Sequence, residues 1–432
     1  MKLEPEIIRS DLTNDEYHLY HHPSGLDILI MKMEGFTTTE ALFATKYGSV
    51  NNCFKTKNSD EFIHVPDGIA HYLEHKLFEN EECGVFELYA KTGAMANAFT
   101  SFNITGYTFS ASSDYKEPLR ILLDFVQKPY FTDENVEKER GIIAQEIKMT
   151  NDSPSRALFY ELLKSLYHIH PVKIDIGGTV ESINEITTEL LYQCYNTFYN
   201  LHNMVLSIAG NVDDIEVLKI CDENLKPCEN IELQTLFPDE PYGVVRKRSH
   251  IKRQVGIPIF TLGFKCDVYS GYELEKKSLA ADLMLRMLFG PMSIWYKEAF
   301  EAGLINSTFG TEVFSASEGY FVIMLTGESK YAEDVYASIC LEIEHIRSRP
   351  LDENLFKTLL RGCYGNEVMK LNLVSECAET MCLAYMQDMT GFDTLKILSE
   401  LTIEDISDAI RLLDIDRASF CTVSDKDSFD LK

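Results

Sequence analysis

The sequence predicts a protein of two similar halves, each of which mixes helices with strands. The chain has 432 residues, 45% of them hydrophobic and 25% charged, which excludes disordered and collagen-like classes and allows a large buried core. Segments typical of strands and of helices alternate along the chain. Three short segments of the first half also recur in the same order, 213 to 222 residues later.

The first half contains several strand candidates and two clear helix candidates. The strand candidates are rich in aliphatic, aromatic or threonine residues and cover residues 26–33, 42–47, 97–112 and 204–209. The turn Pro66–Gly68 predicts a helix that starts within it and runs to Phe78. A second helix is expected from Thr132, because acidic residues follow directly in its first turn.

The three recurring segments indicate an internal duplication. They pair Gly68–Phe78 with Gly290–Phe300, Gly106–Phe109 with Gly319–Val322, and Asp133–Val136 with Asp352–Leu355. A polar stretch that contains prolines separates the two halves. We therefore expect a first α+β domain at residues 1–225, a linker at 226–250 and a duplicated domain at 251–432.

Charge and cysteine content narrow the class of protein. Acidic residues outnumber basic residues 68 to 40, and this excess argues against nucleic acid or an anionic membrane as the main partner. The basic run at residues 246–253 is interpreted as a solvated face. No apolar window approaches the length of a membrane span, and the first residues do not resemble a secretory signal. Eleven scattered cysteines without a C-x-x-C pair complete the prediction of a cytoplasmic protein with reduced thiols.

His71, Glu74 and His75 form an H-x-x-E-H motif, the inverse of the H-E-x-x-H zinc motif. On a helix, residues four apart share a face, so the two imidazoles can bind one metal ion. Glu74 lies on the same side, where it can take a proton from a water molecule that zinc has acidified. The alternative is a pair of ordinary histidines on a helix.

A catalytic zinc ion needs a third protein ligand, and the helix from Thr132 offers Glu139 and Glu146. These residues are seven apart and therefore lie on one face. Glu146 is flanked by isoleucines, where a carboxylate is costly unless it is paired or bound to metal, so a ligand role is favoured over a solvent-facing one. Glu139 lies in a turn that is charged all round, and its role stays open between a surface residue and a support for the site.

The duplicated half lacks these donors. The alignment pairs the four residues His71, Glu74, His75 and Glu146 with Ser293, Tyr296, Lys297 and Gly365. Because this second set cannot rebuild a zinc site, we expect one catalytic half and one half that contributes shape and substrate contacts.

The sequence resembles the pitrilysin/insulinase family of zinc peptidases with the inverted motif, and in particular its half-length bacterial members, which are similar to subunits of mitochondrial processing peptidase. The resemblance covers nearly the whole chain. It is carried by Gly68–His75, Gly93–Ser101, Glu139–Glu146, His170–Pro171, Gly177–Thr179 and Asn203–Gly210.

The resemblance implies a role for each residue of the site. One zinc ion per chain is held by His71, His75 and Glu146, with Glu74 as the general base and Glu139 as a supporting carboxylate. The edge strand that binds an extended peptide contains Asn97, Ala98, Phe99 and Thr100.

The resemblance also implies an architecture. Two similar α+β halves each consist of a mostly antiparallel sheet covered by helices, and dimerisation closes a chamber. The dimer is either a homodimer or a heterodimer with a paralogous subunit that lacks the motif.

The main functional hypothesis is a zinc-dependent endopeptidase that hydrolyses short or unfolded peptides, alone or with a partner subunit. Many active relatives carry an arginine and a tyrosine in the second half that grip the substrate and steady the oxyanion. Residues 300–307 here contain neither, and one lost donor of this kind costs on the order of 10²–10³ in rate. The alternative is a non-catalytic subunit for peptide binding or assembly that keeps a vestigial zinc site.

Overall fold

The computed structural model describes residues 3–81 and 84–427. The chain divides into two compact units, each assembled from segments that are not consecutive in the sequence. Unit 1 contains residues up to Ile147, Asp175–Phe237 and Val368–Asp393. Unit 2 contains Lys148–Ile174, Pro238–Glu367 and the residues from Thr394 onward.

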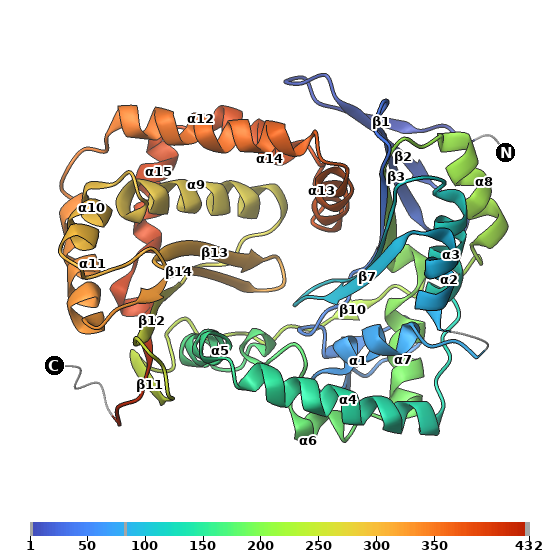
Figure 1. Ribbon diagram of the computed structural model, residues 1–432, viewed down its shortest axis with the longest axis horizontal. Coiled ribbons are helices and arrows are strands. Elements are labelled where there is room, and N and C mark those ends of the chain that lie inside the picture. Colours follow the sequence, from blue (N-terminus) through green and yellow to red (C-terminus); the bar gives the residue numbers. More distant parts are fainter. Residues whose placement is uncertain (1–2, 82–83, 428–432) are drawn as a thin grey trace. The chain divides into compact units, whose positions relative to one another are not determined.

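Unit 1 is built on a seven-stranded sheet with the order β1-β2-β3-β9-β4-β8-β7 (Figure 1). Its strands are β1 (Glu6–Arg9), β2 (Glu16–His21), β3 (Asp27–Lys32), β4 (Thr39–Thr45), β7 (Met95–Thr100), β8 (Thr105–Ala111) and β9 (Met204–Gly210). All neighbouring strands are antiparallel except β3 and β9, which are parallel. The strand candidates at residues 26–33, 42–47, 97–112 and 204–209 are therefore confirmed as β3, β4, the β7–β8 hairpin and β9.

The central strand β9 is buried along its whole length. Leu206 and Ile208 belong to the larger core cluster, whereas Val205 and Ala209 belong to a second cluster that includes helix α13 (Val374–Met386). Its one hydroxyl, on Ser207, donates to the main-chain carbonyl of Ala378 at 2.7 Å. The nearly continuous apolar sequence of β9 thus follows from burial on both faces of the sheet.

Besides α13, six longer helices in the described residues accompany this sheet. They are α1 (Ile69–Leu77), α2 (Val85–Thr92), α3 (Lys116–Val126), α4 (Asp133–Asn151), α7 (Thr188–Phe198) and α8 (Asp214–Asn224). A short helix, α6 (Val180–Ile183), and a three-stranded sheet of β5 (Cys53–Lys55), β6 (Ile63–His64) and β10 (Gln234–Thr235) complete the unit. The helices expected at the Pro66–Gly68 turn and after Thr132 are confirmed as α1 and α4.

Unit 2 is built on a five-stranded sheet with the order β11-β15-β12-β14-β13 (Figure 1). Its strands are β11 (Arg248–Lys252), β12 (Ile259–Lys265), β13 (Gly310–Ala316), β14 (Tyr320–Glu328) and β15 (Ala418–Ser424). Its main helices are α5 (Pro154–Leu166), α9 (Gly271–Phe289), α10 (Ile294–Glu301), α11 (Ala332–Ile346), α12 (Glu353–Lys370), α14 (Asp393–Glu400) and α15 (Ile403–Ala409).

The two sheets share one topology, which confirms the predicted α+β fold with two similar halves. Strands β11 and β15 are parallel, β12 is antiparallel to β15 and β14, and β13 forms an edge. Strands β3, β9, β4, β8 and β7 repeat this pattern in unit 1.

One part of the predicted alignment between the halves is wrong. Two helices, α1 and α2, lie between β4 and β7, and two helices, α9 and α10, lie between β12 and β13. By element order α1 therefore corresponds to α9, whereas the segment Gly290–Phe300 contains α10, the counterpart of α2. The sequence match aligned Gly68 with Gly290 and so paired α1 with α10, whereas the order of the helices pairs α1 with α9.

Each half of the sequence contributes one helix to the compact unit of the other half. Helix α5 precedes the first half's last strand in the sequence, yet it packs against β12 and β15 of unit 2. Helix α13 belongs to the second half of the sequence and packs against β4 and β9 of unit 1. The compact units therefore interleave along the chain, whereas the expected halves at 1–225 and 251–432 are defined by the sequence repeat.

The basic run at residues 246–253 forms the edge strand β11 and its flanks. Its charges are matched by acidic side chains of unit 2: Arg246 lies 3.3 Å from Glu161, and Arg248 lies 2.6 Å from both carboxylate oxygens of Glu333. This pairing is that of a solvated face with internal ion pairs.

Candidate metal centre

Helix α1 begins where two backbone segments, residues 67–68 and 177–178, meet. Its N-cap, Gly68, has a φ of 91°, and a Cβ atom added there would lie 2.5 Å from the carbonyl oxygen of Gly177. Gly178 has a φ of 72°, and its added Cβ would lie 2.4 Å from the carbonyl oxygen of Asp67. Only glycine meets both requirements without strain, so this contact fixes the start of the motif helix.

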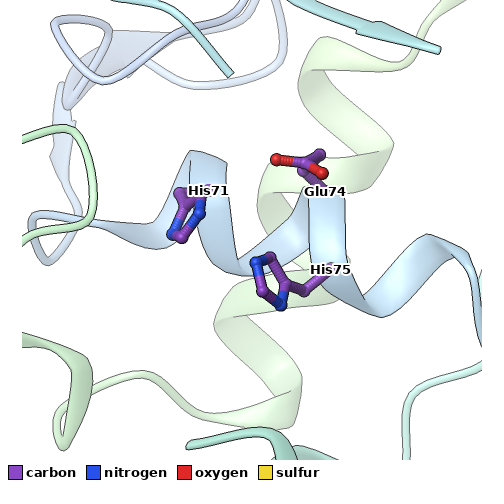
Figure 2. Close-up of side chains that lie close together, drawn as sticks. All are labelled: His71, Glu74 and His75. Atoms are coloured by element: carbon purple, nitrogen blue, oxygen red, sulfur yellow. The ribbon is translucent and has the colours of Figure 1, made fainter. Parts of the chain in front are cut away.

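The burial pattern of α1 separates its core face from its site face. Ile69, Ala70, Tyr72, Leu73 and Leu77 are buried. His71, Glu74 and His75 are only half-buried, and Figure 2 shows their side chains projecting from α1. The imidazole rings of the two histidines lie 4.6 Å apart between centroids, and ligand atoms of all three residues lie within 4.8 Å of one another. The apolar spacing of α1 therefore brings the three predicted residues together.

Helix α4 brings Glu146 to the same two histidines. One carboxylate oxygen lies 3.7 Å from Nε2 of His71, and the other lies 3.5 Å from Nε2 of His75. Four atoms arranged tetrahedrally around zinc at its usual bond length are about 3.3 Å apart. Two imidazole nitrogens and a carboxylate at these separations fit a zinc ion, in both spacing and donor chemistry.

Glu139 lies behind His75. Its side chain is buried, with 6% of the residue exposed, and its Oε1 accepts a hydrogen bond from Nδ1 of His75 at 2.9 Å. Burial alone raises the pKa of Glu139, but the bond from His75 and the charges of His75, Lys76 and Lys138 outweigh it and lower the pKa. Because the ionised carboxylate can only accept, Nδ1 carries the proton, and Nε2 is the nitrogen that faces Glu146 and would bind a metal ion.

The surroundings of His75 favour a positive charge. Burial lowers its pKa, but the hydrogen bond to Glu139 and the charges of Glu74, Glu139 and Glu146 raise it above the usual histidine value. A site whose carboxylates stabilise an imidazolium also attracts a metal cation.

Glu74 occupies a different position from the other carboxylates. Its Oε2 accepts a hydrogen bond from Oγ1 of Thr100 at 3.1 Å. Burial raises the pKa of Glu74, and Glu146 adds to this effect, whereas His75 and Thr100 oppose it. A carboxyl group with a raised pKa accepts a proton more readily than an ordinary glutamate does.

Several contacts that the sequence did not reveal hold α1 against its neighbours. Lys76 is fully buried, its ammonium group contacts Glu79, and it donates to the main-chain carbonyl of Asn135 at 3.3 Å. The hydroxyl of Tyr72 donates to the carbonyl of Val136 at the start of α4. A buried lysine next to a metal motif has no sequence signal of its own, since lysine is normally exposed.

The predicted peptide strand is β7, an edge strand of unit 1. In the described part of the chain it pairs only with β8, and its other side is open to pairing. The predicted residues Asn97, Ala98, Phe99 and Thr100 all lie on it. Thr100 ends the strand and also contacts Glu74, so the strand and the motif helix meet at this residue.

Among its described residues, unit 2 carries no comparable group of donors. In residues 3–81 and 84–427, His71, Glu74 and His75 are the one set of three or more His, Cys, Asp or Glu side chains this close together. Ser293 caps α10 by accepting from the amide of Tyr296 at 3.0 Å, and Gly365 lies within α12. The corrected counterpart of α1, helix α9, has no histidine or cysteine in its sequence.

Two family descriptions match consecutive parts of the chain. Residues 65–180 match "Insulinase (Peptidase family M16)", and residues 185–362 match "Peptidase M16 inactive domain". Together with the shared topology of the two sheets, these matches define an M16-type peptidase fold, and the candidate metal centre lies in the part that matches the insulinase description.

The relatives extend this similarity to the whole chain. The uncharacterized zinc protease YmfH of Bacillus subtilis (strain 168) is 39% identical over 420 residues, which are 94% of this chain and 97% of the relative. A crystal structure of an M16-like peptidase from Alicyclobacillus acidocaldarius has a TM-score of 0.90 and 33% identity, and covers 98% of this chain and 99% of that one. The chain belongs to the pitrilysin/insulinase family, peptidase family M16.

Pitrilysin itself shares the fold. Its crystal structure has a TM-score of 0.76 at 15% identity, and the match covers 99% of this chain but 48% of that chain. This chain therefore corresponds in size to about half of pitrilysin. In the described residues, no helix combines the length and the apolar character that a membrane span requires.

Proposed function

We propose that this protein is a zinc-dependent endopeptidase that hydrolyses short or unfolded peptides. The observation that carries the proposal is the approach of the Nε2 atoms of His71 and His75 to the carboxylate of Glu146. A half-buried glutamate, Glu74, lies beside the two histidines on α1. Relatives named as zinc proteases support the same class of reaction.

His71, His75 and Glu146 would hold one zinc ion per chain. When bound, zinc polarises the substrate carbonyl and lowers the pKa of a water ligand to about 7. Glu139 keeps the His75 ring in the orientation and tautomer that metal binding needs.

Glu74 is assigned the proton transfers. It takes a proton from the attacking water and delivers it to the departing amine, so it must exchange a proton easily in both directions. Its burial, which raises its pKa, suits this role.

Strand β7 is assigned to substrate binding. A peptide in extended conformation would pair with its open side, along Asn97, Ala98, Phe99 and Thr100, through main-chain hydrogen bonds, and side-chain pockets would add preference. Main-chain pairing tolerates many sequences, which suits peptides without fixed structure.

The proposal extends to organisation and location. Residues 1–225 form the catalytic half, 226–250 the connection and 251–432 the duplicated half, in a cytoplasmic protein. Dimerisation with a second copy or with a paralogous subunit without the motif would close the chamber and would supply the electrophilic group that residues 300–307 lack.

The test compares wild type with Glu74→Gln and Glu146→Ala. We expect Glu74→Gln to bind zinc normally and to lose peptide hydrolysis by at least 10²-fold. Glu146→Ala should lower the zinc content of the purified protein. Glu87→Gln, at an exposed position on α2, is the matched control for Glu74. Normal turnover by Glu74→Gln would contradict the mechanism.

A non-catalytic peptide-binding or assembly subunit with a vestigial zinc site is the second proposal. It is favoured by the absence of the arginine and tyrosine at residues 300–307. Incubation of the zinc-loaded protein with an unstructured peptide library, alone and with a partner subunit, separates the two proposals. Cleavage by the isolated protein excludes the second.

A further inference from the structure

We infer that Thr100 is a positioning residue that orients Glu74 and ties it to the peptide-binding strand. The inference rests on the proposed function, because it assigns how the general base of that site is held. The observation behind it is the hydrogen bond from Oγ1 of Thr100 to Oε2 of Glu74, at 3.1 Å.

Thr100 is held firmly by its backbone. It is paired with Thr105 across the β7–β8 hairpin, and the next residue, Ser101, donates its amide to the carbonyl of Ile104 at 2.8 Å. The hydroxyl of Thr105 donates to the carbonyl of Tyr47 at 2.8 Å. The hairpin end is therefore anchored at both strands, and the Thr100 hydroxyl starts from a fixed point.

The loop beneath this hairpin adds a second anchor. The amide of Ser49 donates to the carbonyl of Ser101 at 3.1 Å, and the amide of Val50 donates to the carbonyl of Phe102 at 2.9 Å. A Cβ atom added to Gly48 would lie 2.4 Å from the Phe102 backbone, so the two segments are in direct contact. A side chain on such a support can orient a flexible neighbour.

Glu74 needs this support, because a glutamate has three rotatable side-chain bonds. With Oε2 engaged by Thr100, the carboxylate keeps Oε1 as the oxygen that meets the attacking water. Small displacements of a reacting group cost much of the rate: about 1 Å can cost 10²-fold. A loss of this single bond should therefore lower kcat.

Thr100 links the proposed substrate strand to the general base. The residue ends the strand that would pair with the substrate backbone, and it also holds the base. The scissile peptide and the general base would thus both be positioned by the end of strand β7. Removal of the hydroxyl should change the chemical step and leave substrate binding through the backbone of β7 intact.

The test compares Thr100→Val, which keeps the shape of threonine, with Thr100→Ser, which keeps the hydroxyl. We expect Thr100→Val to lower kcat at least tenfold, with KM within twofold of wild type and one zinc ion per chain. Thr100→Ser should stay within threefold of wild type. Thr311→Val, on β13 of unit 2, controls for loss of a threonine hydroxyl from the corresponding edge strand.

Crystal structures of wild type and both variants provide a readout that does not depend on activity. The Glu74 carboxylate should keep its place in wild type and Thr100→Ser, and should move or lose its order in Thr100→Val. The inference is overturned if Glu74 is unmoved and kcat is normal in Thr100→Val. It is also overturned if both variants show the same fall in kcat, the same change in KM and the same fall in zinc content. If the wild type cleaves no peptide, the proposed function fails, while the three structures still decide whether Thr100 positions Glu74.

Discussion

Nδ1 of His75 donates a hydrogen bond to Oε1 of Glu139 across 2.9 Å, from helix α1 to helix α4. The bond connects the motif helix to the helix that carries Glu146, and it sets the tautomer of a proposed metal ligand. Glu139 is the most deeply buried of the three carboxylates named here, Glu74, Glu139 and Glu146.

Glu139→Gln should weaken zinc binding about 10- to 100-fold, since the amide cannot stabilise the ring as the carboxylate does. The dissociation constant can be measured by competition with a chromophoric chelator. Glu137→Gln is the matched control, because Glu137 lies on the same helix, is largely exposed and forms an ion pair with Arg140. Equal zinc affinity in wild type and Glu139→Gln would remove the supporting role.

Gly68→Ala should destabilise unit 1 and lower its zinc affinity, because α1 could no longer start at its present position. Alanine at a left-handed backbone position costs roughly 1–2 kcal/mol. At Gly68 the new methyl group also meets the Gly177 carbonyl at 2.5 Å, so backbone must shift in addition. Thermal unfolding and zinc titration measure the two effects.

Gly35→Ala is the control that separates the two costs. Gly35 has a φ of 85°, but an added Cβ there meets nothing within 4 Å. Its Tm should fall less than that of Gly68→Ala, and its zinc affinity should equal that of wild type. Equal losses of Tm in the two variants would show that the contact with Gly177 contributes nothing.

The H-x-x-E-H spacing predicted α1 and its site face correctly, because helical periodicity determines which residues share a face. Glu146 lies near both histidines, but its turn is not the buried apolar one that the sequence predicted. Its isoleucine neighbour Ile142 is 49% exposed, and the Glu146 side chain is 36% exposed, so that turn is not a buried apolar one. The costly buried carboxylate is Glu139, which the charged residues around it concealed.

Sequence patterns could not predict that α5 packs in unit 2 and α13 in unit 1. Apolar periodicity shows that α5 and α13 each bury a face, but it does not show which sheet covers that face. The sequence also showed no sign that the segment at 226–250, the proposed connection, contains a structural anchor of unit 2, the carboxylate of Glu240.

Glu240 should make the protein sensitive to acid. Its carboxylate accepts from the amides of His168, Ile169 and His170 and from the ammonium of Lys265, at 2.7 to 2.8 Å. Burial opposes ionisation, but these donors outweigh it and lower the pKa of Glu240 to about 2. The native state therefore favours the ionised form, and the stabilisation is complete above the usual glutamate pKa and is lost as pH falls from about 4.5 to 2.

The measurement is Tm against pH for wild type and Glu240→Gln. The variant should melt at a lower temperature than wild type at pH 6–7, and the two curves should converge toward pH 2. Burial also lowers the pKa of Lys265, but this shift concerns alkaline pH and leaves the acid limb unchanged. Asp239→Asn, at the exposed neighbouring position, should follow wild type at every pH. A constant difference between the curves would exclude Glu240 as the titrating group.

Two glycine positions in unit 2 should respond to alanine with opposite signs. Gly362 lies in α12, where an added Cβ meets nothing within 4 Å, so Gly362→Ala should stabilise the protein by about 0.5–1 kcal/mol through helix propensity.

Gly263 lies in β12, where an added Cβ would lie 2.7 Å from the side chain of Leu162, a buried residue of α5. Gly263→Ala should therefore lower Tm, and the shortened variant Leu162→Ala should relieve the clash and make the two losses less than additive. Strict additivity would contradict the packing of α5 on the sheet of unit 2.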